Sequence, residues 1–225
     1  MEDHIKELIK SVLLNNETNV FDALMGAMYR FTNESVNSIS EMKQKQNTKW
    51  KGDLFESLCR LVLLKDYDDV WYLRDIPEDI RQHLQLTKHD MGIDLVAKKG
   101  DDYFAVQSKW KNPYKKGTIP GTVKLKHEKV NWNELCTFLV LCERSGPWKH
   151  YIVMTNGVGI RRVGRRSKKD KSICLKTFQS IPLGTWYDIA DFKGEVLGRD
   201  DEIDEDETLN EKRLKFFTNQ QKEEA

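Results

Sequence analysis

Two β-rich segments joined by a short polar turn constrain this chain more than any other feature. Residues 92–97 and 103–110 are rich in β-branched and aromatic side chains, and Gly100 lies among charged residues between them. Glycine readily adopts the turn conformations that other residues resist. The pattern therefore predicts a β-hairpin.

Polar side chains interrupt both predicted strands of this hairpin. Residues two apart in a strand point the same way, so Gln107 and Lys109 are expected on one face of the second strand. Asp94 interrupts an apolar run in the first strand, where a buried carboxylate needs a cation or hydrogen bonds to offset its desolvation. Two interpretations are open: Asp94 is a structural residue held in a salt bridge, or it is a ligand of a divalent cation.

The segments around the hairpin alternate between helical and strand patterns, which is typical of an α/β fold. A short polar segment ends in Pro77, and proline suits the first position of a helix. The predicted helices cover residues 5–14, 20–31, 50–65 and 130–143, with a further helical turn after Pro77. The predicted strands beyond the hairpin cover residues 70–73, 151–154 and 173–178.

Composition divides the chain into one main domain with two small appendages. A chain of 225 residues that is 39% hydrophobic is long enough to bury one sizeable core. Residues 195–207 are strongly acidic, which is typical of a solvated linker. We expect a helical extension over residues 1–45, the main domain over 46–192, and an acidic linker with the start of a further helix over 193–225.

Charge and cysteine usage exclude some classes of protein. The 37 Lys and Arg nearly balance the 36 Asp and Glu, so net charge alone identifies no partner. The four cysteines form no CxxC pair, which argues against a zinc site or a disulfide framework. No apolar run approaches the roughly 18 residues of a membrane span. An intracellular protein, cytoplasmic or nuclear, with no membrane partner is the expectation.

Three short motifs resemble a known family of nucleases. They are Gly-Asp-Leu-Phe-Glu at residues 52–56, Gly-Ile-Asp-Leu at 92–95 and Gln-Ser-Lys at 107–109. Together they resemble the Mrr-like restriction endonuclease branch of the PD-(D/E)XK nucleases, over residues 50–178. The resemblance implies a restriction-endonuclease-like core, in which helices flank a central mixed β-sheet. It also implies a Mg²⁺-dependent endonuclease that hydrolyses DNA phosphodiester bonds, with Mn²⁺ as a substitute.

The resemblance assigns a role to each polar residue of these motifs. Asp94 is the motif aspartate and a metal ligand, and Gln107 stands where most relatives carry Glu or Asp, with its side-chain oxygen as the ligand. Lys109 orients or activates the attacking water and stabilises charge on the phosphate. Glu56 reaches the metal directly or through water, and Asp90 matches a further acidic position. Because Gln107 is neutral, metal affinity is expected to be lower, and an inactive module that binds nucleic acid for a larger machine is the alternative.

Two basic segments are the expected contacts for DNA. Between residues 98 and 129, nine lysines face three acidic residues, and residues 161–171 hold seven basic residues against one acidic one. Such clusters grip phosphates, although many lysine-rich loops are only solvated, and the arginine-rich run also resembles a nuclear localisation signal. The candidate contacts are Lys111, Lys115, Lys116, Arg161, Arg162, Arg165 and Arg166.

Two further partners are expected besides DNA. Residues 216–221 carry aromatic and glutamine residues and bear a faint likeness to the segment before some helicase cores, which implies a C-terminal helicase domain in a longer chain. A double-strand cut by this fold usually implies two copies of the site, so a homodimer is the other expectation.

Overall fold

A computed structural model gives the fold of the chain. It describes residues 1–15, 19–34, 48–87, 92–112, 128–161 and 167–192. Residues Met1–Asp191 form one compact unit. The predicted boundary between residues 45 and 46 and the predicted acidic linker from residue 193 lie outside the described residues. None of the helices described is long and apolar enough to cross a membrane.

The N-terminal helices pack directly onto the main domain. Helices α1 (Glu2–Leu14) and α2 (Val20–Glu34) both contact α4 (Thr48–Leu63), close to the predicted ranges. Phe21 of α2 stacks on Phe178 with ring centroids 4.6 Å apart. Arg60 of α4 donates to the Glu2 carboxylate of α1 at 2.7 Å. The helical extension therefore shares its apolar contacts with the domain that carries the candidate site.

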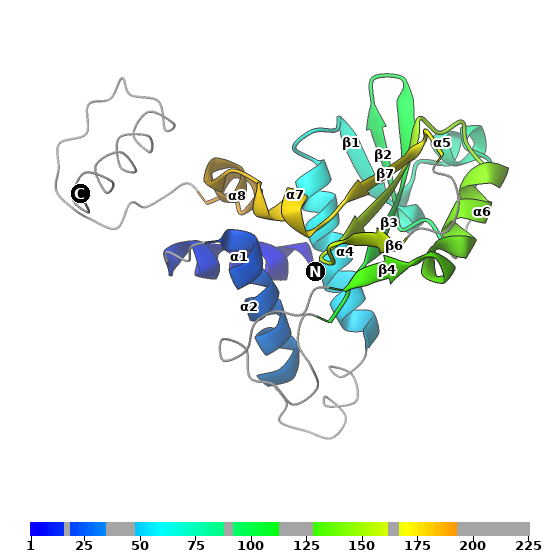
Figure 1. The fold of residues 1–225 in the computed structure, drawn as a ribbon. Coiled ribbons are helices and arrows are strands. Elements are labelled where there is room, and N and C mark those ends of the chain that lie inside the picture. The colour runs from blue at the N-terminus through cyan, green and yellow to red at the C-terminus, as the bar shows by residue number, and fades with distance from the viewer. Residues whose placement is uncertain (16–18, 35–47, 88–91, 113–127, 162–166, 193–225) are drawn as a thin grey trace, which may run out of the picture. The chain divides into compact units, whose positions relative to one another are not determined.

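A five-stranded mixed sheet forms the centre of the fold, in the order β1-β2-β3-β5-β7 (Figure 1). β1, β2 and β3 pair antiparallel, whereas β3, β5 and β7 pair parallel. The predicted hairpin is confirmed as β2 and β3, with Gly100 at φ +58° in the turn. The strands are β1 (Asp69–Tyr72), β2 (Leu95–Lys99), β3 (Asp102–Lys109), β5 (His150–Thr155) and β7 (Asp170–Ile173).

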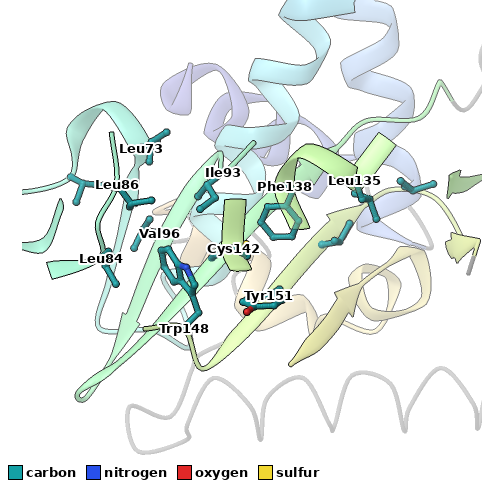
Figure 2. Packing of buried hydrophobic residues seen from close by; sticks show 14 residues of the cluster. Leu73, Leu84, Leu86, Ile93, Val96, Leu135, Phe138, Cys142, Trp148 and Tyr151 are labelled. Carbon is teal, nitrogen blue, oxygen red and sulfur yellow. The ribbon is translucent and has the colours of Figure 1, made fainter. Parts of the chain in front are cut away.

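Helices cover both faces of this sheet, so its strands are buried on both sides. On one face, Phe138 and Cys142 of α6 (Cys136–Arg144) gather with Trp148 and Tyr151 against Val96 (Figure 2). Ile80 of the short helix α5 (Glu78–His83) packs against this cluster, and Leu84 and Leu86 of the following segment extend it. The other face is covered by α4, which contacts β1 and β3. This arrangement confirms the α/β fold with a central mixed sheet flanked by helices.

Two predicted elements were wrong. The segment predicted as one helix over 130–143 begins instead with strand β4 (Lys129–Asn131) and a 3₁₀ turn, η2 (Trp132–Leu135), before α6 starts. A capping box between Asn131 and Glu134 starts the turn, and Val130 is buried where β4 pairs in parallel with β6 (Gly159–Arg161). Apolar periodicity does not distinguish a short buried strand from the first turn of a helix.

The segment predicted as a strand over 173–178 is mostly helical. β7 ends at Ile173, and α7 (Leu175–Gln179) follows it. Leu175 and Phe178 are both buried, which is the spacing of one helical turn rather than of a strand. A second helix, α8 (Leu183–Ile189), was not predicted, and it buries Trp186 beside Phe21 of α2.

We expect Gly157→Ala to destabilise the protein by about 1–3 kcal/mol, because a Cβ there would overlap well-packed backbone. The added atom would lie 2.2 Å from the carbonyl oxygen of Glu128. Gly52→Ala in α4 is the matched control, since a Cβ there meets nothing within 4 Å. Helix propensity should make that control more stable by about 0.5–1 kcal/mol. Urea denaturation measures both, and equal stabilities for the two variants would contradict the packing described.

Candidate active site

Asp94 lies directly before β2 and is tied by its backbone to strands on both sides. Its N–H donates to the carbonyl of Val106 in β3 at 2.9 Å. Its carbonyl accepts from the N–H of Leu73, the first residue of the 3₁₀ turn η1 (Leu73–Asp75), at 3.0 Å. The preceding Ile93 is buried in the cluster beneath α6 (Figure 2). These contacts fix the start of β2 through hydrogen bonds to β3 and η1 and through the packing of Ile93 beneath α6.

The close approach of α6 explains the glycine of the Gly-Ile-Asp-Leu motif. A Cβ at Gly92 would lie 3.0 Å from both the N and the Cα of Phe138. Any larger residue would push the helix away from the segment that leads into Asp94. Gly92 therefore allows the helix and this segment to pack in contact.

The Asp94 carboxylate accepts two hydrogen bonds on one oxygen. Both the backbone N–H and the hydroxyl of Ser108 donate to Asp94 Oδ2, at 2.7 Å and 3.0 Å. Burial raises the pKa of Asp94, and a smaller contribution from Asp53 acts the same way, while the Ser108 bonds and the Lys109 ammonium oppose the shift. No hydrogen bond from a described residue reaches Oδ1, so this oxygen is the one available to a further ligand.

Gln107 has a buried acceptor atom that nothing in the described structure satisfies. The residue lies on β3 with 6% of its surface exposed. Its Oε1 is buried and accepts no hydrogen bond from the residues described. An unsatisfied buried acceptor costs about 1–3 kcal/mol, and native structures contain few of them. Such an atom points to a ligand at this position.

Lys109 places a positive charge close to the Asp94 carboxylate. It is the last residue of β3 and is partly buried. Its charge acts to lower the pKa of Asp94, so the two groups are within electrostatic reach of each other. No ion pair or hydrogen bond joins its ammonium to the residues that the structure describes. Asp94 is therefore bonded to Ser108 and is not held in a salt bridge with Lys109.

Helix α4 brings two more carboxylates near Asp94. Glu56 and Asp53 lie one helical turn apart, and Glu56 is partly buried. Burial, followed by the charges of Asp94 and Asp53, raises the pKa of Glu56 to about 8, although Arg74 acts in the opposite direction. A carboxyl of this kind holds its proton at neutral pH until a cation compensates its charge.

These acidic groups interact electrostatically without forming a closed cage. Among the described residues, no three His, Cys, Asp or Glu side chains converge closely enough to hold a metal ion. The amide oxygen of Gln107 is a further potential ligand. Magnesium is usually bound through one or two carboxylates together with waters and substrate phosphates. An open site lined by oxygen atoms therefore suits magnesium better than a closed cage of side chains.

The structure describes two of the candidate DNA contacts, Lys111 and Arg161. Lys111 is committed to an ion pair, because its ammonium donates to both carboxylate oxygens of Glu134 at 2.6 and 2.7 Å. Arg161 is exposed at the end of β6. The remaining candidates, together with the predicted metal ligand Asp90, lie outside the described residues; they are Lys115, Lys116, Arg162, Arg165 and Arg166.

Sequence reasoning missed two residues that act on the site. Ser108 lies between Gln107 and Lys109 and was given no role, yet its N–H and hydroxyl both donate to Asp94. No pattern in the sequence signals that contact. Asp53 was detectable, because it lies three residues before Glu56 and shares its helix face.

We expect Glu56→Gln to stabilise the protein more at pH 9 than at pH 6. The folded state keeps the proton of Glu56 up to a pKa of about 8, above the value of 4.5 for a free side chain. The stability of the parent protein should therefore fall as pH rises between these values, and glutamine removes that dependence. Urea unfolding without divalent metal measures the difference at each pH. The same difference at both pH values would contradict the raised pKa.

A comparison with protein families gives a match, which covers the central part of the chain. Residues 62–157 match the model of a restriction endonuclease family of the Mrr type. The match contains Asp94, Gln107 and Lys109, begins after Glu56, and does not extend to residues 216–221, so it gives no support to a helicase fusion. No curated protein and no solved structure gives a significant match. Residues 62–157, less than half of the chain, are therefore similar to the Mrr-type restriction endonucleases, which is consistent with the resemblance at Asp94, Gln107 and Lys109.

Proposed function

We propose that this chain is a metal-dependent endonuclease that hydrolyses DNA phosphodiester bonds, with Mg²⁺ as its cofactor and Mn²⁺ as a substitute. The family match over residues 62–157 supports a nuclease. The single observation that carries the metal requirement is the buried Oε1 of Gln107, which accepts no hydrogen bond from the described residues. A hard divalent cation is the ligand that a cluster of carboxylate and amide oxygens prefers.

The residues present fit such a cation. Gln107 Oε1 and the Asp94 carboxylate would hold it from two neighbouring strands, and Glu56 would reach it from α4, directly or through water. Ser108 bonds one oxygen of Asp94 and leaves the other available. When bound, Mg²⁺ neutralises charge on the phosphate and favours ionisation of a nearby water.

The other groups of the site have complementary tasks in the proposed reaction. The Lys109 ammonium has no ion pair among the described residues, so it can contact a phosphate oxygen and orient the attacking water. A positioned cation stabilises the negative charge that develops on the phosphate in the transition state. Glu56 has to lose the proton that it retains below a pKa of about 8 before it can act as a ligand. Metal binding at neutral pH should therefore release a proton from Glu56.

DNA binding is the part of the proposal that rests on charge. Arg161 and Lys129 are exposed on the paired strands β6 and β4, and Lys168 and Lys169 are exposed shortly before β7. Lysine and arginine contacts to phosphate supply affinity that is independent of sequence. Such a domain suits a larger DNA-processing or restriction protein, and two copies of it would allow both strands to be cut.

A second candidate function is a nuclease-fold module that binds nucleic acid without cutting it. Two observations favour it: Gln107 is neutral, and among the described residues no three His, Cys, Asp or Glu side chains converge on one point. Such a module would bind DNA equally well with and without chelator. Loss of Lys109 would then leave DNA binding unchanged.

Cleavage of plasmid and single-stranded DNA with Mg²⁺, Mn²⁺ or EDTA separates the two functions. We expect metal-dependent cleavage that falls by roughly 100-fold or more in Asp94→Ala and Lys109→Ala, since each removes charge stabilisation at the reacting phosphate. Lys176→Ala, which changes an exposed lysine of α7 outside both basic segments, is the matched control and should cleave normally. Gln107→Glu should reach half-maximal activity at lower Mg²⁺. Equal DNA binding by all variants with no cleavage by any would favour the binding module.

A further inference from the structure

The chain is anchored residue by residue where it leaves β3. The hydroxyl of Thr155 donates to the carbonyl of Lys109 at 2.8 Å. The indole of the next residue, Trp110, packs edge-on against Phe55 of α4, with ring centroids 5.8 Å apart. Two consecutive residues are thus held from different sides, one by β5 and one by α4.

The third residue, Lys111, is held at both backbone groups and at its side chain. The amide of Asn156 accepts from the Lys111 N–H and donates to the Lys111 carbonyl, both at 2.7 Å. The Lys111 ammonium meets Glu134, whose carboxylate also accepts from the N–H of Asn131 at 2.9 Å. Burial acts to raise the pKa of Glu134, but the bonds from Lys111 and Asn131 outweigh it and leave that pKa lowered.

Thr155 and Asn156 continue the pairing of β3 with β5 beyond the end of the regular ladder. The parallel register ends with Lys109 opposite Thr155. Thr155 is fully buried and Asn156 is 4% exposed, so both polar side chains are directed inward. Buried backbone groups need hydrogen-bond partners, and here side chains provide them after the strand partner has ended. The same two side chains thereby fix the path of residues 109–111.

These anchors leave two side-chain groups of the segment without a bond to a described residue, the Lys109 ammonium and the buried indole N–H of Trp110. The backbone carbonyl of Lys109 is bonded, Trp110 is packed, and Lys111 is held at three points. The Lys109 ammonium is the charged one of the two, and it lies within electrostatic reach of the carboxylates of Asp94 and Glu134. A fixed backbone restricts where this ammonium can reach, which matters because misplacement by about 1 Å can lower a rate by roughly 100-fold.

We propose that Thr155 and Asn156 are positioning residues that hold the exit of β3 and thereby direct the Lys109 ammonium towards the site formed by Asp94 and Gln107. This inference rests on the proposed nuclease function for its effect on rate. Neither residue touches the reacting atoms in this arrangement. Their effect should therefore appear in turnover and in the placement of Lys109, and leave DNA affinity largely unchanged.

Two substitutions at Thr155 separate the effect of its hydroxyl from the effect of its size. Valine matches the shape of threonine and removes both the hydrogen bond to the Lys109 carbonyl and the one from the Gly157 N–H, whereas serine keeps the hydroxyl that makes both. With Mg²⁺ and plasmid DNA, we expect Thr155→Val to lower kcat by roughly 10- to 100-fold at an almost unchanged KM. Thr155→Ser should retain most of the activity. If valine cleaves as well as threonine, or if serine loses as much as valine, the inference is overturned. Thr155→Ala replaces the valine variant if that variant does not fold.

A measurement without DNA keeps this inference distinct from the proposed function. The ¹³Cε signal of Lys109 is followed by NMR while Asp94 is titrated without metal. In the parent protein and in Thr155→Ser, the Lys109 signal should shift as Asp94 ionises, because the two charges interact. In Thr155→Val, that shift should shrink or disappear. If the parent protein does not cleave DNA, the proposed function fails, and an unchanged Lys109 shift in Thr155→Val would still overturn the positioning role.

Discussion

The pairing of β3 with β2 on one side and with β5 on the other determines where the central candidate residues lie. Gln107 and Lys109 belong to β3 itself, and the backbone N–H of Asp94 is bonded to Val106 of that strand. The change from antiparallel to parallel pairing also occurs at β3. Residues far apart in the sequence therefore meet at the end of a single strand, and every contact that holds β3 also holds the site.

The polar side chains near the end of β3 differ in which contacts compensate the cost of their burial. Ser108 stabilises the ionised form of Asp94, and burial opposes it. Glu56 has no such donor among the described residues and keeps its proton to a pKa of about 8. Gln107 carries no charge but has a buried oxygen that accepts no hydrogen bond from the part of the chain described. Asp94 and Glu56 interact electrostatically, and Gln107 lies on the strand that pairs with β2, so a ligand bound here would supply interactions that the described residues do not.

The hairpin could be predicted from the sequence for a physical reason, and the same pattern singled out three polar residues as a candidate site. Gly100 and the strongly β-prone runs leave few alternative structures, and a polar residue in an apolar strand is conspicuous. Residues 130–143 and 173–178 were wrongly predicted because short apolar runs fit strands and helices equally well. Their structure depends on tertiary contacts, such as the pairing of Val130 with Ile160. Lys111 could not be assigned to Glu134 without the fold, since the two residues lie 23 positions apart.

The central claim is that Gln107 and Asp94 hold one divalent cation between neighbouring strands. Crystals of the full chain soaked in Mn²⁺ test it most directly, because anomalous scattering locates the ion without assumptions about activity. The account predicts an anomalous peak in contact with Gln107 Oε1 and with the Asp94 carboxylate, and its loss in Gln107→Leu. A Gln107 oxygen bonded to protein or water, with no Mn²⁺ beside it at saturating metal, would contradict the account.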